Sequence, residues 1–486
     1  MHVIILIVVL LLAAYLRFSQ LDYATLGPGE VEIYEAAKDY ASGNILKSFY
    51  IFDTPPMPKY LGALMLIIFG FSESALRLIP AIFGIATVLL TYLFAKKFYN
   101  KNTGLLAASF VAFSFIHIQF SRYFQLEVML SFFFLMAFYY FFDFTENRKK
   151  NYALFGIAVA LGLLTKFIMI YALVSIILIS IIYRHVSFRR RPQFSVTMDN
   201  FLLKALIVAV VLFFAIWPHS LMPIKTDITL SVDFSDGPHV NHITPSIPQL
   251  FLALGKRSVS AQQAGVLALP LGYSIFFLVK ENILFILAFI AGLIFVLKKP
   301  KKIDKMILLS LLVFMLLLWA QRWGFTYRYL VIIVPFLAII AARWIDGIKS
   351  NMSIVAIGAI VLLLFGSALA VHPSYIFHQN FQYTESELYQ AEGMKESIAY
   401  INENCSVLYT DSYYHFILAP YYNNSVKYLD QTRLPTCVLT GYTKTIYSAP
   451  GSENFIMEDF INTHSCELRK TVEKYDVVLQ QIYYCS

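Results

Sequence analysis

Residues 152–191 read YALFGIAVALGLLTKFIMIYALVSIILISIIYRHVSFRRR, and this stretch decides the fold class. Two apolar runs, 152–165 and 167–183, are separated by Lys166, and the second is followed by a cluster of arginines. A helix needs about 20 mostly apolar residues to cross the hydrocarbon core, and basic residues gather in cytoplasmic loops. The stretch therefore predicts two membrane-spanning helices joined by a turn on the outer side.

The same pattern extends over most of the chain. Its 486 residues are 58% hydrophobic and only 14% charged, whereas a typical soluble domain has about 25% charged residues. A soluble globular protein is therefore excluded for most of the length. Eleven spans are predicted, at 2–17, 76–95, 104–120, 123–143, 152–165, 167–183, 201–217, 274–297, 306–320, 327–342 and 352–371.

Basic residues follow every even-numbered span, which predicts the orientation of the chain in the cell membrane. The N-terminus then lies in the cytoplasm, while the loops 17–75 and 218–273 and the tail 372–486 lie outside. The first span lacks a basic start and a small-residue cleavage site, so we expect a retained helix rather than a signal peptide. The basic residues cluster in the short cytoplasmic loops between the apolar runs, so the net charge of +8 does not indicate a nucleic-acid partner.

The tail differs in composition from the transmembrane module, residues 1–371. Short apolar runs alternate with polar or helical stretches, which predicts a small extracytoplasmic α/β domain over 372–486. An even number of cysteines in this segment favours two disulfides in an oxidising compartment; zinc ligation and unpaired thiols are the alternatives. Three pairings remain open for the four residues, which are Cys405, Cys437, Cys466 and Cys485.

Charged residues at the predicted outer interface are the candidates for chemistry, because a charge near the hydrocarbon is costly. Cations at headgroup depth suit a lipid phosphate, and a carboxylate opposite them suits a general base that deprotonates a hydroxyl. For the cations, snorkelling to the interface is the alternative. The candidates are the acids Glu30, Glu32, Asp53 and Glu127 and the cations Lys59, Arg77, Arg122, Lys166, Arg322 and Arg328.

Six motifs along the membrane region resemble a known family. In chain order they are Gly27–Tyr34, Asp53–Leu61, Phe69–Pro80, Ser121–Glu127, Gly162–Lys166 and Arg328–Pro335. Together they resemble the GT-C glycosyltransferases of the protein O-mannosyltransferase and aminoarabinose-transferase superfamily, glycosyltransferase family 39. The resemblance implies the GT-C fold and a single-sugar transfer from a polyprenyl- or dolichyl-phosphate donor. The acceptor would be a hydroxyl on protein, glycan or lipid on the outer face, and the anomeric carbon would invert.

The resemblance also implies roles for individual residues. Glu30 would be the catalytic base, with Glu32 as the alternative, because the Asp-Glu pair of the family has lost one acid here. Glu127 stands where the family has an aspartate and would orient a basic partner or the acceptor. Thr54 replaces the histidine of the family. The donor phosphate would be held by Arg122, Lys166, Lys59 and Arg328.

The outer loop 218–273 contains His239 and His242, and the resemblance implies that a histidine of this loop lies near the substrate cavity. A metal pair is open to them, but no third ligand stands out, so we assign no metal site and leave a divalent cofactor open. An oligosaccharyltransferase should show a Trp-Trp-Asp-Tyr-Gly motif, which the chain lacks. A lipid-linked sugar flippase or transporter should show inverted repeats and polar residues at the midplane. A non-catalytic assembly subunit would leave Glu30 dispensable.

Overall fold

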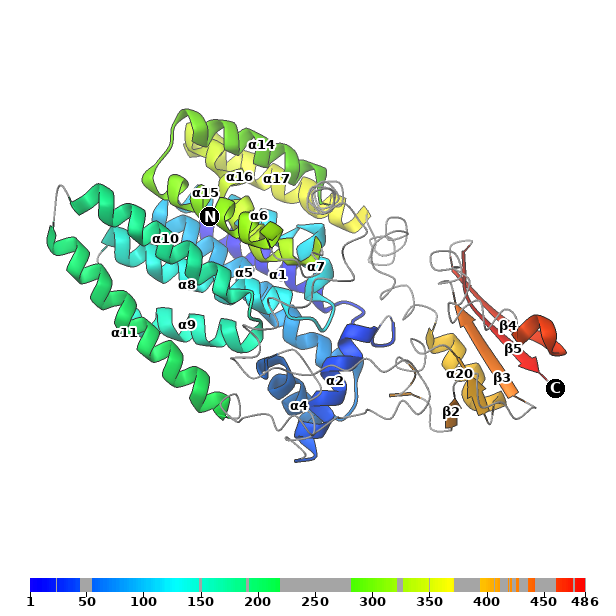
Figure 1. Ribbon diagram of the computed structural model, residues 1–486. Coiled ribbons are helices and arrows are strands. Elements are labelled where there is room, and N and C mark those ends of the chain that lie inside the picture. Colours follow the sequence, from blue (N-terminus) through cyan, green and yellow to red (C-terminus); the bar gives the residue numbers. More distant parts are fainter. Residues whose placement is uncertain are drawn as a thin grey trace.

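The computed structural model places a helical bundle beside a smaller sheet-containing tail (Figure 1). The residues that it describes are 1–22, 24–43, 55–147, 151–188, 192–218, 281–320, 327–348, 350–370, 394–405, 407–410, 418, 420–421, 425–427, 436–441, 460–474 and 477–485. Every structural statement below refers to these residues.

The bundle contains a helix at each of the eleven predicted spans. Its elements are α1 (His2–Phe18), α5 (Glu73–Phe98), α6 (Lys101–Ala112), α7 (Phe115–Ser121), α8 (Glu127–Asn147), α9 (Tyr152–Thr165), α10 (Met169–Phe188), α11 (Pro192–Ile216), α14 (Ile283–Lys298), α15 (Lys302–Ala320), the 3-10 helices η2 (Tyr327–Ile333) and η3 (Arg343–Gly347), α16 (Val334–Ala342) and α17 (Ser350–Ala370). Within the described ranges, four helices are long and apolar enough to cross a membrane, or five with one bent pair, and six more are shorter and apolar. The chain is a multi-pass membrane protein.

The third predicted span, 104–120, is not one continuous helix but a bent pair. It consists of α6 and α7, whose axes differ by 61°. The first helix ends at Ala112, and Ser114 caps the second, since its hydroxyl accepts the His117 N–H. The Glu281 carboxylate accepts the Phe115 N–H at 2.8 Å. These two acceptors satisfy amides that a new helix start leaves without intrahelical partners.

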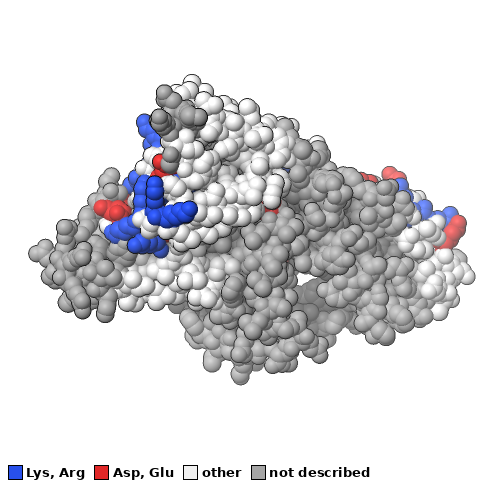
Figure 2. Space-filling view, turned by 90° about the horizontal axis from the view of Figure 1, so that it is seen from above, with Lys and Arg blue, Asp and Glu red and all other residues white. Residues whose placement is uncertain are grey.

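Aromatic packing forms the centre of the bundle. The Phe336 ring on α16 lies with its centroid 5.3 Å from Phe138, 5.8 Å from Phe134 and 6.1 Å from Phe94. Such edge-to-face rings bury large apolar areas with favourable geometry. At one end of the bundle Lys and Arg side chains gather (Figure 2).

Two further helices lie in the first predicted outer loop, at the end of the bundle that faces the tail (Figure 1). They are α2 (Pro28–Ala41) and α4 (Met57–Phe69). Gly62 allows their close approach, because a Cβ at this position would lie 2.9 Å from the Ala37 Cβ. The pair packs against the bundle next to the start of α5, where the charged residues of the first loop meet α5.

The tail contains one helix, α20 (Met394–Asn404), and a five-stranded sheet of order β2-β1-β3-β5-β4. The strands are β1 (Val407–Tyr409), β2 (Ser425–Lys427), β3 (Thr436–Gly441), β4 (Cys466–Lys474) and β5 (Val477–Cys485). β1 is parallel to β2 and β3, and β5 is antiparallel to β3 and β4. Buried Met394, Ile401, Leu408, Leu439 and Ile482 form its core.

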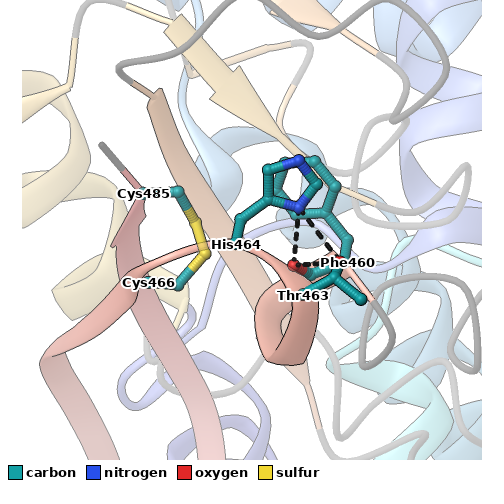
Figure 3. The surroundings of a disulfide bond; sticks show 5 residues. All are labelled: Phe460, Thr463, His464, Cys466 and Cys485. Atoms are coloured by element: carbon teal, nitrogen blue, oxygen red, sulfur yellow. Dashed lines mark hydrogen bonds between the residues drawn. A yellow bond between two sulfur atoms is a disulfide. The ribbon is translucent and has the colours of Figure 1, made fainter.

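The four tail cysteines form two disulfides, as the sequence indicates, and the structure selects the pairing. Cys405, just after α20, pairs with Cys437 on β3, and Cys466 pairs with Cys485 across β4 and β5. Beside the second bridge, the His464 ring stacks on Phe460 at a centroid distance of 4.0 Å (Figure 3). The second bridge thus joins two strands that are neighbours in the sheet, and the first joins the end of α20 to β3.

Candidate functional site

Glu127, Lys166 and Arg328 meet at one end of the bundle, although they come from three separate elements. Glu127 is the first residue of α8, Lys166 follows α9, and Arg328 lies in η2. The Lys166 Nζ lies 2.6 Å from Glu127 Oε1, and the Arg328 Nε lies 3.6 Å from the same oxygen. The Tyr329 ring packs against both cations, with its centroid 4.5 Å from the Lys166 Nζ. We call Glu127, Lys166, Arg328 and Tyr329 the outer cluster.

The burial of the outer cluster is uneven. The Glu127 side chain is fully buried, while those of Lys166 and Arg328 are 17% and 24% exposed. Glu127 Oε2 has no hydrogen-bond partner among the residues that the structure describes. A buried oxygen without a partner costs about 1–3 kcal/mol. The cluster thus contains one buried acid and two partly exposed cations. One oxygen of the acid can still accept a hydrogen bond.

Local sequence explains why Glu127 and Lys166 occupy these places. Glu127 starts a helix, where a negative charge interacts favourably with the helix dipole. Lys166 takes an extended backbone conformation that ends α9, and its N–H is bound to Gly162 O. The side chain therefore leaves the helix end and turns toward α8.

Glu30 has a different environment from the one expected for a base. Its carboxylate is fully buried and accepts four hydrogen bonds. Two come from the Arg77 guanidinium, at 2.8 and 2.7 Å, and two from the backbone N–H groups of Gly27 and Phe124, at 2.9 and 2.7 Å. A bidentate charge-assisted pair of this kind is a strong and rigid contact. The expectation that Glu30 faces an acceptor hydroxyl does not match this geometry.

Arg77 uses all of its N–H donors in the same hydrogen-bond network. Besides Glu30 it binds the carbonyl oxygens of Leu21, Ala24 and Thr25, at 2.8 to 2.9 Å. A guanidinium has five N–H groups, and each one is engaged here. The pair therefore joins the loop before α2 to α5, and through Phe124 it reaches the turn before α8. We call Glu30 and Arg77 the buried ion pair.

A sequence signal for this role of Glu30 exists in Gly27-Pro28-Gly29-Glu30. Proline is favoured at the first position of a helix, and a glutamate at the third position reaches back to the N–H of the cap residue. In the structure Gly27 is that cap residue, and Glu30 accepts its N–H. The capping pattern thus identifies Glu30 as a helix-start residue, and the functional interpretation overlooked it.

Arg122 also binds backbone. It donates to the carbonyl oxygens of Leu16, Ser19 and Gln20, where α1 ends. Cationic side chains commonly satisfy the last carbonyls of a helix in this way. Only 1% of Arg122 is exposed, so it lies away from a headgroup that approaches the surface.

The remaining predicted residues are placed as follows. Lys59 is buried in the first turn of α4, and Glu32 is half-buried on α2. Asp53, His239, His242 and Arg322 lie outside the described residues. Within the described part of the chain, no three His, Cys, Asp or Glu residues lie close enough to hold a metal ion.

The segment 122–127 connects these separate sites. Arg122 binds the end of α1, the Phe124 N–H binds Glu30, and Glu127 binds Lys166. Phe124, which binds Glu30 of the buried ion pair, lies three positions before Glu127 of the outer cluster. The buried ion pair therefore fixes the backbone that carries Glu127.

Part of the chain matches known proteins in sequence. Residues 53–219 match the model of the family described as dolichyl-phosphate-mannose-protein mannosyltransferase. An uncharacterized protein of Aquifex aeolicus (strain VF5) is 35% identical over 168 residues, which are 33% of this chain and 34% of that protein. A second Aquifex aeolicus protein is 36% identical over 118 residues, 24% of this chain and 27% of its own length. The chain thus covers only about a third or less of these relatives.

Solved structures match over a larger part of the chain. ArnT from Cupriavidus metallidurans bound to undecaprenyl phosphate has a TM-score of 0.56 at 13% identity, over 99% of this chain and 97% of that chain. The Archaeoglobus fulgidus oligosaccharyltransferase in complex with Zn and sulfate has a TM-score of 0.56 at 14% identity, over 91% of this chain and 68% of that chain. The resemblance to the GT-C superfamily is confirmed, and at these identities the structural likeness concerns the fold.

Proposed function

From the GT-C glycosyltransferase fold, we propose that the chain transfers one sugar from a polyprenyl- or dolichyl-phosphate donor to an acceptor hydroxyl. The outer cluster carries the proposal. Lys166 and Arg328 are accessible cations beside a buried acid, and charge-assisted bonds from such groups suit a phosphate oxygen. The ArnT structure of the same fold contains undecaprenyl phosphate, which supports a lipid phosphate as the ligand class.

In this proposal the acceptor oxygen attacks the anomeric carbon as the bond from that carbon to the phosphate oxygen breaks. The phosphate leaves with the bonding electrons, and Lys166 and Arg328 stabilise its growing negative charge. The acceptor proton passes to Glu127 Oε2, the oxygen without a partner among the described residues. Direct displacement inverts the anomeric carbon. Glu127 replaces Glu30 as the proposed base, since the four donors around Glu30 leave it no access to an acceptor.

We place the outer cluster and the tail on the extracytoplasmic side and the N-terminus in the cytoplasm. Two disulfides in the tail support this orientation, because disulfides persist in oxidising compartments. The transmembrane module 1–371 would carry the reaction, and the domain 372–486 would lie over it.

The test of the base is a transfer assay with Glu127→Gln in the purified protein. Removing a general base lowers turnover by about 100-fold or more, while release of polyprenyl phosphate from the parent measures the normal rate. Glu127→Asp, which keeps the charge, should retain part of the activity. Full activity in Glu127→Gln combined with an inactive Glu32→Gln would assign the base to Glu32.

The test of the phosphate site is binding of undecaprenyl phosphate to Lys166→Met and Arg328→Met. Each should weaken binding by about 1.5–3 kcal/mol, the range for hydrogen bonds to charged groups, with no change for the neutral alcohol. Lys298→Met is the matched control, since Lys298 is exposed at the far end of α14. Unchanged phosphate affinity in both variants rules out this site. Mass spectrometry of lipids and glycans from a deletion strain would identify the sugar and acceptor.

A further inference from the structure

We infer that Tyr421 and Lys395 of the tail form a joint that fixes the loop 21–27, and that the joint positions Glu127 through the buried ion pair. This inference rests on the proposed function for its catalytic consequence, while the joint itself is independent of it. The joint consists of Tyr421 and Lys395 on the tail and Asp22, Leu26 and Glu73 on the membrane module.

Tyr421 contacts two parts of the membrane module at once. Its hydroxyl donates to Glu73 Oε1 at 3.2 Å and accepts the Leu26 N–H at 2.8 Å. Its ring lies edge-on to Phe71, with the centroids 5.3 Å apart. Burial and the neighbouring Glu73 carboxylate raise the pKa of the Tyr421 phenol above its usual range. The hydroxyl thus stays protonated and remains a donor.

Lys395 provides the second contact of the joint. Its Nζ donates to the Asp22 carbonyl oxygen at 2.6 Å and lies 3.4 Å from Glu73 Oε1. The Glu73 carboxylate therefore contacts both tail residues. Because Lys395 binds the Asp22 carbonyl oxygen and Tyr421 binds the Leu26 N–H, the tail contacts the loop near both of its ends.

The two tail residues belong to one packed unit. Lys395 lies in α20, and Asn402 of the same helix donates to the Tyr421 carbonyl oxygen at 3.4 Å. The Tyr421 N–H is bound to the carbonyl oxygen of Leu418, a fully buried core residue. Cys405 follows α20 and joins it to β3 through its disulfide. The tail therefore presents Tyr421 and Lys395 as a preformed pair.

The same loop is held from the other side by the buried ion pair. Arg77 binds Leu21, Ala24 and Thr25, and Glu73 lies one helical turn before it on α5. Leu26 precedes Gly27, whose N–H binds Glu30. Contacts from the tail and the bundle thus alternate along 21–27, and loosening the tail contacts frees the loop that holds Glu30 against Phe124.

Amide hydrogen exchange on the full chain in lipid nanodiscs, without any substrate, tests the joint. Tyr421→Phe removes the acceptor of the Leu26 N–H, and losing one hydrogen bond should speed exchange at Leu26 by about 3- to 10-fold. If the joint supports the buried ion pair, exchange at the Phe124 N–H rises as well. Tyr400→Phe, a tyrosine change on α20 outside the joint, should leave both amides unchanged. Parent-like exchange at Leu26 and Phe124 in Tyr421→Phe overturns the inference.

Kinetics separate a positioning role from mere support of the fold. Tyr421→Phe and Lys395→Met should each lower kcat by about 3- to 10-fold, as expected for a lost hydrogen bond, with unchanged affinity for undecaprenyl phosphate. Their effects should be non-additive with Glu73→Gln, because the three residues share one contact. Lys470→Met on exposed β4 is the control. An unchanged kcat beside faster exchange refutes positioning. A parent protein that transfers no sugar refutes the proposed function instead, and the exchange result still decides the joint.

Discussion

At the scale of single residues, two of the buried carboxylates, Glu30 and Glu127, have opposite assignments. Glu30 is satisfied by four donors, and Glu127 has one oxygen without a partner in the described structure. Both acids face cations, so charge alone does not separate them. The distinction lies in the accessibility of the cations, since Arg77 is fully buried whereas Lys166 and Arg328 reach the surface.

The assignment of Glu30 predicts a stability effect. Glu30→Gln leaves the buried Arg77 without its opposite charge, and breaking a buried pair in this way costs about 3–5 kcal/mol. We expect a matching loss in the free energy of unfolding, measured by denaturant unfolding in micelles. Glu35→Gln is the control, because the pair of this half-buried acid with exposed Lys38, at 3.9 Å, contributes at most about 1 kcal/mol. A Glu30→Gln protein of normal stability and no turnover would restore Glu30 as the base.

At the scale of the elements, close helix contacts depend on a few glycines. Gly292 on α14 faces α16, and a Cβ there would lie only 2.0 Å from the Ile340 carbonyl oxygen. Because backbone cannot move aside like a flexible side chain, α14 can approach α16 this closely only with glycine at this position.

Gly292→Ala should therefore destabilise the bundle by about 1–3 kcal/mol, the usual effect of overpacking. Gly358→Ala on α17 is the matched control, since nothing lies within 4 Å of its added methyl group. The control should be neutral or slightly stabilising, because alanine is the better helix former by about 1 kcal/mol. Thermal unfolding of both variants in the same detergent measures the difference, and equal stability would contradict the close α14–α16 contact.

At the scale of the whole molecule, the tail disulfides and the joint act together. The bridge from Cys405 to Cys437 ties α20 to β3, and α20 carries Lys395 into the joint. A folded tail therefore helps to hold the loop 21–27 next to the bundle.

Peptide mapping without reduction should recover Cys405 with Cys437 and Cys466 with Cys485, and no free thiol. Loss of either bridge should cost about 2–5 kcal/mol of tail stability, because the unfolded tail regains conformational freedom. The closed segments of 32 and 19 residues favour a somewhat larger effect for the first bridge. Four alkylatable thiols in the native protein, or another pairing, would contradict the sheet register described here.

The sequence by itself determined the membrane class, the positions of the helices and the presence of disulfides. These properties depend on local runs of residues and on whether such a run prefers lipid or water. A run such as 152–165 is apolar whatever it contacts in the folded protein. It also placed Glu127, Lys166 and Arg328 among the candidates, because charges near the hydrocarbon are few. The motif resemblance predicted the GT-C superfamily for the same reason, as its segments are local.

Only the tertiary structure decided which acids have free positions and which cysteines pair. Arg77 lies 47 residues from Glu30, and nothing in the first loop itself shows that this arginine completes the shell of the carboxylate. The break at Ser114 likewise depends on Glu281, which is 167 residues away. Such contacts form where distant segments pack together. Because the groups are buried there, losing the partner of a charge costs several kcal/mol. A residue type and its depth can thus be predicted locally, whereas its role depends on which neighbours the fold places around it.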